Sequence, residues 1–173
     1  DFDDLLTETY RLLKENEEIR QKYANRFQYV LVDEYQDTNY AQQMIVELLT
    51  KDNPHVCVVG DDYQSIYAFR GANISNILKF NKVYPTAKLF KLERNYRSTK
   101  NIVSAANSLM KHNRSQIDKD VYSENADGDK VTVYETISDK REASIVCREI
   151  KRLNKEEHQT YGDIAKLYRP NAQ

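Results

Sequence analysis

The sequence has little glycine. Only four glycines occur in 173 residues, at Gly60, Gly71, Gly128 and Gly162, and none of them is followed by lysine. A phosphate-binding P-loop needs closely spaced glycines and a Gly-Lys step, because its backbone amides must approach the phosphates. We therefore expect no glycine-rich phosphate loop within this chain.

Cysteine and long apolar runs are also scarce. The two cysteines, Cys57 and Cys147, are too few for a disulfide framework, and Cys57 lies inside an apolar segment. This usage is typical of a reduced compartment, so we expect a cytoplasmic protein. No apolar run approaches the roughly 18 residues that a membrane-spanning helix needs. Residues 1–4, Asp-Phe-Asp-Asp, carry three acids, so we expect no signal peptide here.

Neither sign of charge is in excess. The chain carries 26 Lys and Arg against 27 Asp and Glu, which gives a formal net charge of −1. This balance excludes a purely electrostatic nucleic-acid binder but allows a groove that is basic only locally. Hydrophobic residues make up 40% of the chain, enough to bury a core. Because the chain starts at Asp1 and both methionines are internal, we expect a piece of a longer protein.

Strand-like apolar runs alternate with segments of helical spacing. The runs that predict strands are 28–33, 55–60, 87–92, 131–134 and 164–168. The segments that predict helices are 1–25, 40–49, 74–81, 99–110 and 143–153. Strands that alternate with helices imply parallel βαβ units, so we expect an α/β fold. The polar residues 111–130 are expected to form a loop or linker.

Polar clusters follow the first three predicted strands. They are Asp33-Glu34, residues 60–64 and residues 93–97. Ligands of open parallel sheets bind beyond the carboxyl ends of the strands, and fully buried strands have no structural need for such clusters. If the three strands are neighbours, their polar ends converge on one edge of the sheet. We predict the functional site at that edge.

An apolar strand followed by Asp33-Glu34 is how a nucleotide hydrolase presents a magnesium ligand. Mg²⁺ keeps several waters, so one or two carboxylates suffice to hold it. A second carboxylate, one residue further on, can orient or deprotonate an attacking water. Taken alone, two acids at a strand end are more often simply solvated, so the pair needs the context of the other motifs.

Five blocks of sequence together resemble the UvrD/Rep-type superfamily 1 DNA helicases. Residues 32–39 (VDEYQDTN) resemble the Walker B segment of that family, residues 59–72 (VGDDYQSIYAFRGA) its third motif, and residues 92–98 (LERNYRS) its fourth. Residues 1–6 resemble the helix before Walker B, and residues 168–173 the strand end before the large insertion of the second lobe. The blocks keep the order and similar spacing of the family, so the resemblance covers the whole chain.

This resemblance implies a partial RecA-like fold, a parallel sheet flanked by helices of the P-loop NTPase type. Residues 1–97 would be the C-terminal part of the first RecA-like ATPase lobe, and residues 98–173 the N-terminal part of the second. It also implies ATP and Mg²⁺ as cofactors, single-stranded or partially duplex DNA as a partner, 3′-to-5′ movement, and replication or repair proteins as further partners. Because the Walker A loop is absent from this chain, we expect the isolated fragment to be inactive.

The resemblance carries roles at the nucleotide onto five residues. Asp33 and Glu34 would hold Mg²⁺, and Glu34 would be the general base. Gln64 would contact the γ-phosphate through its uncharged amide. Tyr96 would stack on the adenine, and Arg97 would neutralise charge in the transition state as an arginine finger.

A second set of roles concerns DNA. Tyr67 and Phe69 would stack on bases of single-stranded DNA, a contact of about 1–3 kcal/mol per base, and Arg70 would link the DNA and phosphate sides. Phe69 stands where the family usually has tryptophan, which keeps stacking with less area. The structural alternatives are that Tyr67 and Phe69 are ordinary half-buried aromatics and that Arg97 only pairs with Glu93 at the surface.

Two residues of the Walker B segment, Gln36 and Asp37, are expected only to brace the loop. Beside an ATP-dependent helicase, two other functions remain open. One is a helicase-like subunit of a recombination helicase-nuclease, and the other is a non-catalytic DNA-binding relic. A relic has no reason to keep the acidic pair, the glutamine and the arginine together, which favours an active enzyme.

Overall fold

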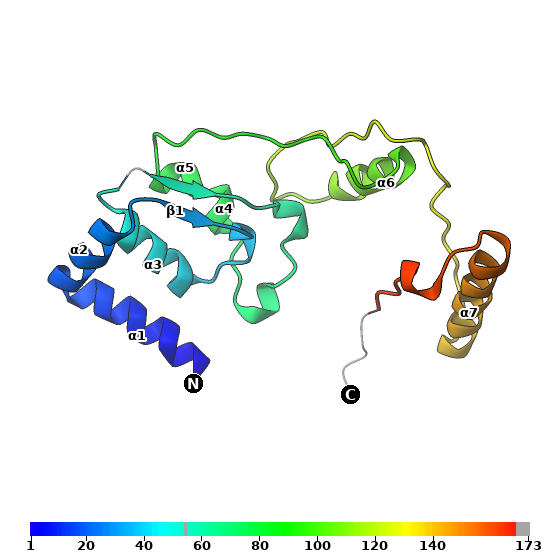
Figure 1. The fold of residues 1–173 in the computed structure, drawn as a ribbon, viewed down its shortest axis with the longest axis horizontal. Helices are drawn as coiled ribbons and strands as arrows, with labels where there is room; N and C mark the ends of the chain where they lie inside the picture. The colour runs from blue at the N-terminus through cyan, green and yellow to red at the C-terminus, as the bar shows by residue number, and fades with distance from the viewer. Residues whose placement is uncertain (54, 169–173) are drawn as a thin grey trace. The chain divides into compact units, whose positions relative to one another are not determined.

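The computed structural model describes residues 1–53 and 55–168 (Figure 1). The chain forms two compact units that divide between Lys130 and Val131. This division by compactness does not test the lobe boundary expected after residue 97, which stays a prediction. Of the block at 168–173 that resembles the strand end of the second lobe, all but Tyr168 lies outside the described residues.

Helices predominate in both units. The first unit contains α1 (Phe2–Glu15), α2 (Glu17–Arg26), β1 (Val30–Val32), α3 (Tyr40–Thr50), β2 (Val56–Val58), α4 (Ser75–Leu78), α5 (Phe80–Val83) and α6 (Lys100–Met110). It also contains the 3₁₀ turns η1 (Tyr35–Asp37), η2 (Asp62–Gln64) and η3 (Ala68–Arg70), and the second unit contains α7 (Asp139–Glu156) and η4 (Tyr161–Asp163). Among the described helices, none is long and apolar enough to cross a membrane.

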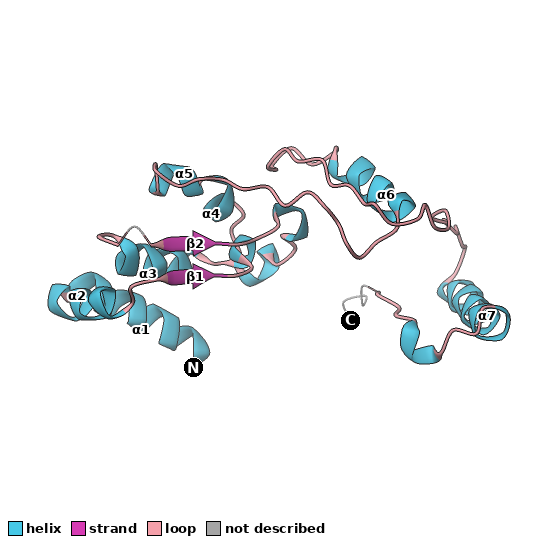
Figure 2. Cartoon of the chain, turned by 45° about the horizontal axis from the view of Figure 1, so that its top comes forward, coloured by secondary structure: helices cyan, strands magenta, loops and turns pink. Residues whose placement is uncertain are grey.

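The two strands lie side by side and run parallel (Figure 2). Their register pairs Val30 with Val56 and Val32 with Val58. Beyond the paired residues, the Val59 amide donates to the Val32 carbonyl at 2.8 Å. The predicted α/β class with a parallel sheet is therefore confirmed. Because parallel strands end at the same edge, the loops after β1 and β2 start next to each other.

Three of the predicted strands are wrong. Residues 87–92, 131–134 and 164–168 form no strand in the structure. A strand needs a neighbour for its amides and carbonyls, and apolar composition supplies only the preference for extended backbone. Phe90 and Leu92 accordingly remain largely exposed. The third polar cluster, residues 93–97, thus follows an extended segment instead of a strand.

The predicted helices form, and two of them are divided. Asn16 breaks the helix predicted over 1–25, because its amide ends α1 on the Leu12 carbonyl while its side chain caps α2 by accepting from the Ile19 amide. The helix predicted over 74–81 is interrupted at Lys79, between α4 and α5. Helices over 40–49, 99–110 and 143–153 are confirmed by α3, α6 and α7.

The loop after β1 is fixed in the small core of the first unit. Tyr35 is almost fully buried and meets the Phe80 ring edge-on, with 5.7 Å between ring centroids. Burial raises the pKa of the Tyr35 hydroxyl to about 12. The buried Asn76 of α4 donates to both the carbonyl and the hydroxyl of Thr38 at 3.0 Å. These contacts hold the backbone that follows the first acidic pair.

Replacing Asn76 by alanine should lower the free energy of unfolding by about 1–3 kcal/mol, because the buried Thr38 hydroxyl and carbonyl oxygens each lose a hydrogen bond, and only the carbonyl keeps another donor, the Asn73 amide. Asn81, an exposed asparagine of α5, is the matched control, and Asn81→Ala should change stability by less than about 0.5 kcal/mol. Urea unfolding of both variants measures the difference. Equal stabilities of Asn76→Ala and the unsubstituted protein would contradict the role of this contact.

Candidate functional site

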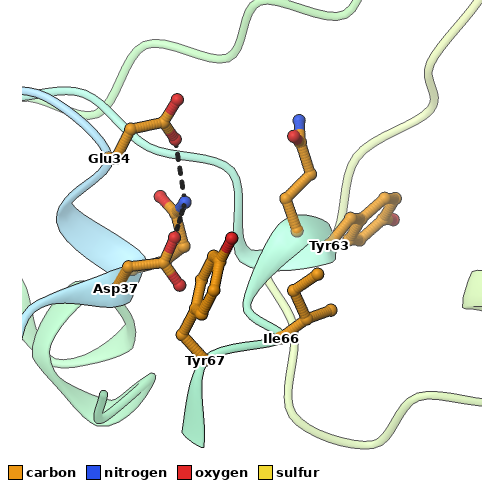
Figure 3. Close-up of a pocket in the computed structure, with 7 residues that line it drawn as sticks. Glu34, Asp37, Tyr63, Ile66 and Tyr67 are labelled. Atoms are coloured by element: carbon orange, nitrogen blue, oxygen red, sulfur yellow. Dashed lines mark hydrogen bonds between the residues drawn. The ribbon is translucent and has the colours of Figure 1, made fainter. Parts of the chain in front are cut away.

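An open pocket of about 490 Å³ lies where the loops after β1 and β2 meet. Its lining residues come from these two loops and the segment that follows them: Glu34, Gln36, Asp37, Tyr63, Gln64, Ile66 and Tyr67. Figure 3 shows Glu34 and Asp37 on one side, Tyr63 and Ile66 on the other, and Tyr67 between them. The structure therefore brings together three of the predicted site residues, namely Glu34, Gln64 and Tyr67.

Glu34 has an unusual backbone conformation. Its φ of 49° and ψ of 41° lie in the left-handed region, which side chains other than glycine rarely adopt. Two contacts hold it there. The backbone N–H of Glu34 donates to Asp33 Oδ1 at 2.8 Å, and Glu34 Oε2 accepts from the side-chain Nε2 of Gln36 at 2.9 Å. Strain held in place in this way clusters at functional sites, which supports a chemical role for Glu34.

Gln36 connects the two loops. Its side chain is buried, with only 1% of the residue exposed, and its Nε2 donates to Glu34 Oε2 and to Asp37 Oδ2 at 2.9 and 3.1 Å. Its Oε1 accepts from the Asp61 amide, 25 residues away in sequence, at 3.0 Å. One amide group therefore fixes the loop after β1 against the loop after β2. The expectation that Gln36 braces the loop agrees with these contacts.

Gly60 leaves the space that Gln36 occupies. A Cβ atom on Gly60 would lie 2.6 Å from Gln36 Oε1 and 2.8 Å from the end of the Ile77 side chain. Both distances are shorter than any normal contact, so a larger residue would displace the Gln36 amide. Close approach thus explains a glycine two residues after β2.

Gln64 lines the pocket, and Asp61 holds its side chain from behind. Gln64 Nε2 donates to Asp61 Oδ2 at 2.7 Å, while Asp61 Oδ1 accepts from Lys119 Nζ at 2.6 Å. Burial alone would raise the pKa of Asp61, but the hydrogen bonds from Lys119 and Gln64 outweigh it and leave the pKa below 3.8. Asp61 is therefore a carboxylate at neutral pH, and it orients the predicted phosphate-contacting amide.

The predicted DNA-contacting residues lie together, and one of them, Tyr67, lines the pocket. The rings of Tyr67 and Phe69 have centroids 5.9 Å apart, and the Arg70 guanidinium lies 5.3 Å from one ring and 5.5 Å from the other. Phe69 is 78% exposed and Tyr67 40% exposed. The alternative that both are ordinary half-buried aromatics therefore does not fit Phe69, which is largely exposed, and fits only Tyr67.

The remaining predicted residues do not line this pocket. Asp33 is exposed beside it, and Tyr96 and Arg97 are exposed in the segment of the fourth motif. The Arg94 guanidinium lies over the Tyr96 ring, 4.7 Å from the ring centre. Across residues 1–53 and 55–168, no ion pair of the Arg97 guanidinium is found, so the surface pair with Glu93 is not formed.

The candidate metal ligands in and beside the pocket are carboxylate oxygens. Within the described part of the chain, no group of three or more His, Cys, Asp or Glu residues could hold a metal ion. Mg²⁺ at a nucleotide is held by one or two carboxylates, phosphate oxygens and waters, so Asp33 and Glu34 fit it. In addition, Asp37 Oδ1 is buried without a hydrogen-bond partner in the structure as described.

Comparison with known proteins decides the family. The family model for the UvrD/REP helicase N-terminal domain matches residues 1–85, and the model for the UvrD-like helicase C-terminal domain matches residues 90–173. The chain belongs to the UvrD/Rep helicase family. The resemblance read from the motifs is thereby confirmed.

Three curated relatives of the UvrD/Rep family are each named ATP-dependent DNA helicase PcrA. The chain is 48% identical to the protein of Staphylococcus epidermidis, 47% to that of Staphylococcus aureus and 46% to that of Leuconostoc citreum. Each match covers 100% of this chain but only 23–24% of the relative. The chain thus spans about a quarter of the length of these relatives.

One residue of the site was not predicted from the sequence. Lys119 belongs to the polar segment 111–130, which the residue pattern indicates only as a loop, yet its ammonium group contacts the third UvrD/Rep motif. Its partner Asp61 lies 58 residues away. No local pattern reports such a contact, because it depends on how the loop returns across the first unit.

The lowered pKa of Asp61 predicts a specific dependence of stability on pH. The stabilisation that the Asp61 carboxylate gives the folded state is fully present above pH 3.8, the ordinary pKa of an aspartate. It is lost as the pH falls through the lower pKa that Asp61 has in the folded state. The difference in unfolding free energy between the protein and its Asp61→Asn variant should therefore shrink below pH 3.8. Urea unfolding from pH 7 to pH 2.5 measures it, and a constant difference would contradict the assignment.

Proposed function

We propose that this chain is part of an ATP-dependent DNA helicase that couples ATP hydrolysis to movement along single-stranded DNA. The observation that carries the proposal is the pocket shared by Glu34, Gln64 and Tyr67. A carboxylate and an amide suited to a phosphate lie next to an aromatic ring suited to a base. The DNA helicases among the relatives support the same activity.

Hydrolysis would begin with a water held beside Glu34. The carboxylate would take a proton from this water while the water oxygen forms a bond to the γ-phosphorus. The bond from that phosphorus to the oxygen bridging the β- and γ-phosphates would break at the same time, so ADP and inorganic phosphate are the products. Gln36 would keep the carboxylate oriented through the bond to Glu34 Oε2. Asp33 and Glu34 would hold Mg²⁺, which when bound supplies positive charge to the phosphates.

Gln64 would report the presence of the γ-phosphate. Its amide now donates to Asp61 Oδ2 at 2.7 Å. A phosphate oxygen that accepts the second N–H of this amide would draw Gln64 toward the nucleotide and move the start of the segment that carries Tyr67. Since Gln64 and Tyr67 are three residues apart and line the same pocket, such a movement would pass directly from the nucleotide to the DNA side.

Tyr96 and Arg97 would complete the nucleotide site from the fourth motif. Both side chains are exposed, and the Arg97 amide is anchored by Asn95 Oδ1 at 3.0 Å. An exposed ring suits stacking on adenine, and a guanidinium suits charge neutralisation at the γ-phosphate. These two roles rest on the family motif. They require a nucleotide that contacts the loops after β1 and β2 and also the fourth motif.

Tyr67, Phe69 and Arg70 would contact single-stranded DNA. Stacking on exposed rings does not depend on sequence, as a translocating enzyme requires. The Arg70 guanidinium over both rings would add a cation next to the DNA backbone. Movement in the 3′-to-5′ direction is proposed from the family alone.

In the full-length protein, Glu34→Gln should abolish ATP hydrolysis stimulated by single-stranded DNA, because the amide cannot accept the proton. Removal of a general base lowers turnover by about 100-fold or more, whereas nucleotide binding should change little. Glu18→Gln, at an exposed position of α2, is the control and should retain normal turnover. Steady-state ATPase and binding of a fluorescent nucleotide measure both quantities. Near-normal turnover of Glu34→Gln would refute the role of Glu34.

Phe69→Ala should weaken binding of a single-stranded oligonucleotide by about 5- to 150-fold, the equivalent of one lost stacking contact of about 1–3 kcal/mol. Phe69→Trp should bind at least as tightly as the unsubstituted protein, because its ring offers more area. Tyr161→Ala removes another largely exposed ring, 66% exposed, and serves as the control. Fluorescence anisotropy measures the dissociation constants. Equal weakening by Phe69→Ala and Tyr161→Ala would argue against a stacking role.

A further inference from the structure

Lys119 is the most enclosed cation near the pocket. Its side chain is 14% exposed, and its Nζ lies 2.6 Å from Asp61 Oδ1 and 2.6 Å from Asp62 Oδ1. The same ammonium lies 3.9 Å from the centre of the Tyr63 ring. One cation therefore contacts three consecutive residues of the third motif.

The segment around Lys119 is held at several points, so the contact is not that of a loose surface lysine. The Ile117 amide donates to Asp62 Oδ2 at 2.7 Å, and the Tyr63 hydroxyl donates to the Lys119 carbonyl at 3.4 Å. Further along, the Tyr122 amide donates to the Glu93 carbonyl at 2.9 Å. The segment is thereby fixed to the third motif at one end and to the fourth motif at the other.

Charge explains why a cation is needed here. Asp62 is only 3% exposed, and a buried carboxylate without a partner is strongly unfavourable. Lys119 neutralises this group and Asp61 together. Burial alone would lower the pKa of Lys119, but its bonds to the two carboxylates outweigh burial and raise it, so the lysine stays charged at neutral pH.

The contact reaches the pocket through Asp61. Lys119 Nζ and the Tyr63 amide both engage Asp61 Oδ1, which turns Oδ2 toward Gln64. The Asp61 amide meanwhile donates to Gln36 Oε1. Lys119 thus fixes the carboxylate that sets the position of the Gln64 amide, without lining the pocket itself.

We propose that Lys119 is a positioning residue for ATP hydrolysis, which holds Asp61 so that the Gln64 amide meets the γ-phosphate. This inference rests on the proposed function, because it concerns the same pocket. It adds that residues 115–123, which carry none of the recognised motifs, belong to the supporting structure of the nucleotide site. Loss of Lys119 should slow turnover more than it weakens binding of ATP or DNA.

The test uses the full-length protein, four single variants, and Gln64→Ala alone and combined with two of them. Lys119→Met removes the charge and keeps the length, Lys119→Arg keeps the charge, and Lys22→Met is an exposed control on α2. Asp61→Asn removes the carboxylate that links Lys119 to Gln64, and it leaves the ion pair between Lys119 and Asp62 in place. The measurements are kcat and KM for ATP with single-stranded DNA, normalised to the active sites titrated with a fluorescent nucleotide.

Lys119→Met and Asp61→Asn should each lower kcat about tenfold and change KM by less than about threefold, a loss on the order of 1.4 kcal/mol in the transition state. Lys119→Arg should recover most of the turnover, and Lys22→Met should match the unsubstituted protein. In a Gln64→Ala background, Lys119→Met should have no further effect, because Lys119 acts through Gln64. If Lys119→Met does not fold, Asp61→Asn with and without Gln64→Ala decides the same question.

Unchanged kcat in either single variant would overturn the proposal, and so would a full tenfold loss on top of Gln64→Ala. These results differ from a failure of the proposed function. If the unsubstituted full-length protein and Lys22→Met both lack ATPase activity with DNA, the helicase assignment itself is refuted, and the inference falls with it. If both hydrolyse ATP normally and only the Lys119 effect is missing, the inference alone is refuted.

Discussion

The buried amide of Gln36 is the interaction on which the site depends. It donates to Glu34 and Asp37 in one loop and accepts from the Asp61 backbone in the next, so it replaces water for three polar groups at once. A neutral amide can do this because it offers donors and an acceptor without adding charge to an acidic region. The ends of two parallel strands are thereby converted into one pocket with defined geometry.

Around this amide, each loop has its own support. Glycine at position 60 leaves the space for Gln36, and Asn76 holds the backbone after the first acidic pair. On the far side, Lys119 balances the charge of Asp61 and Asp62. The pocket is therefore built by residues that touch no substrate in the proposed mechanism, which is the usual arrangement for a site that must hold charged groups in a fixed orientation.

Sequence reasoning succeeded where the signal is local or carried by a motif. The parallel pairing of β1 with β2 and the helices α3, α6 and α7 follow from short apolar patterns. The predicted strand at 87–92 failed because pairing depends on a partner that composition does not reveal. Lys119 was missed for a related reason, since its contact joins positions 58 residues apart. The roles assigned to all the site residues stay predictions, and Tyr96 and Arg97 in addition do not line the pocket.

The most direct test of the account is the turnover of a full-length Gln36→Met variant. Methionine keeps the length of the side chain but offers neither donor nor acceptor, so Glu34, Asp37 and the Asp61 amide would lose their shared partner. The account predicts that kcat for DNA-stimulated ATP hydrolysis falls by at least about tenfold while the variant stays folded and still binds nucleotide. A folded Gln36→Met protein with normal turnover would contradict the claim that this amide assembles the site.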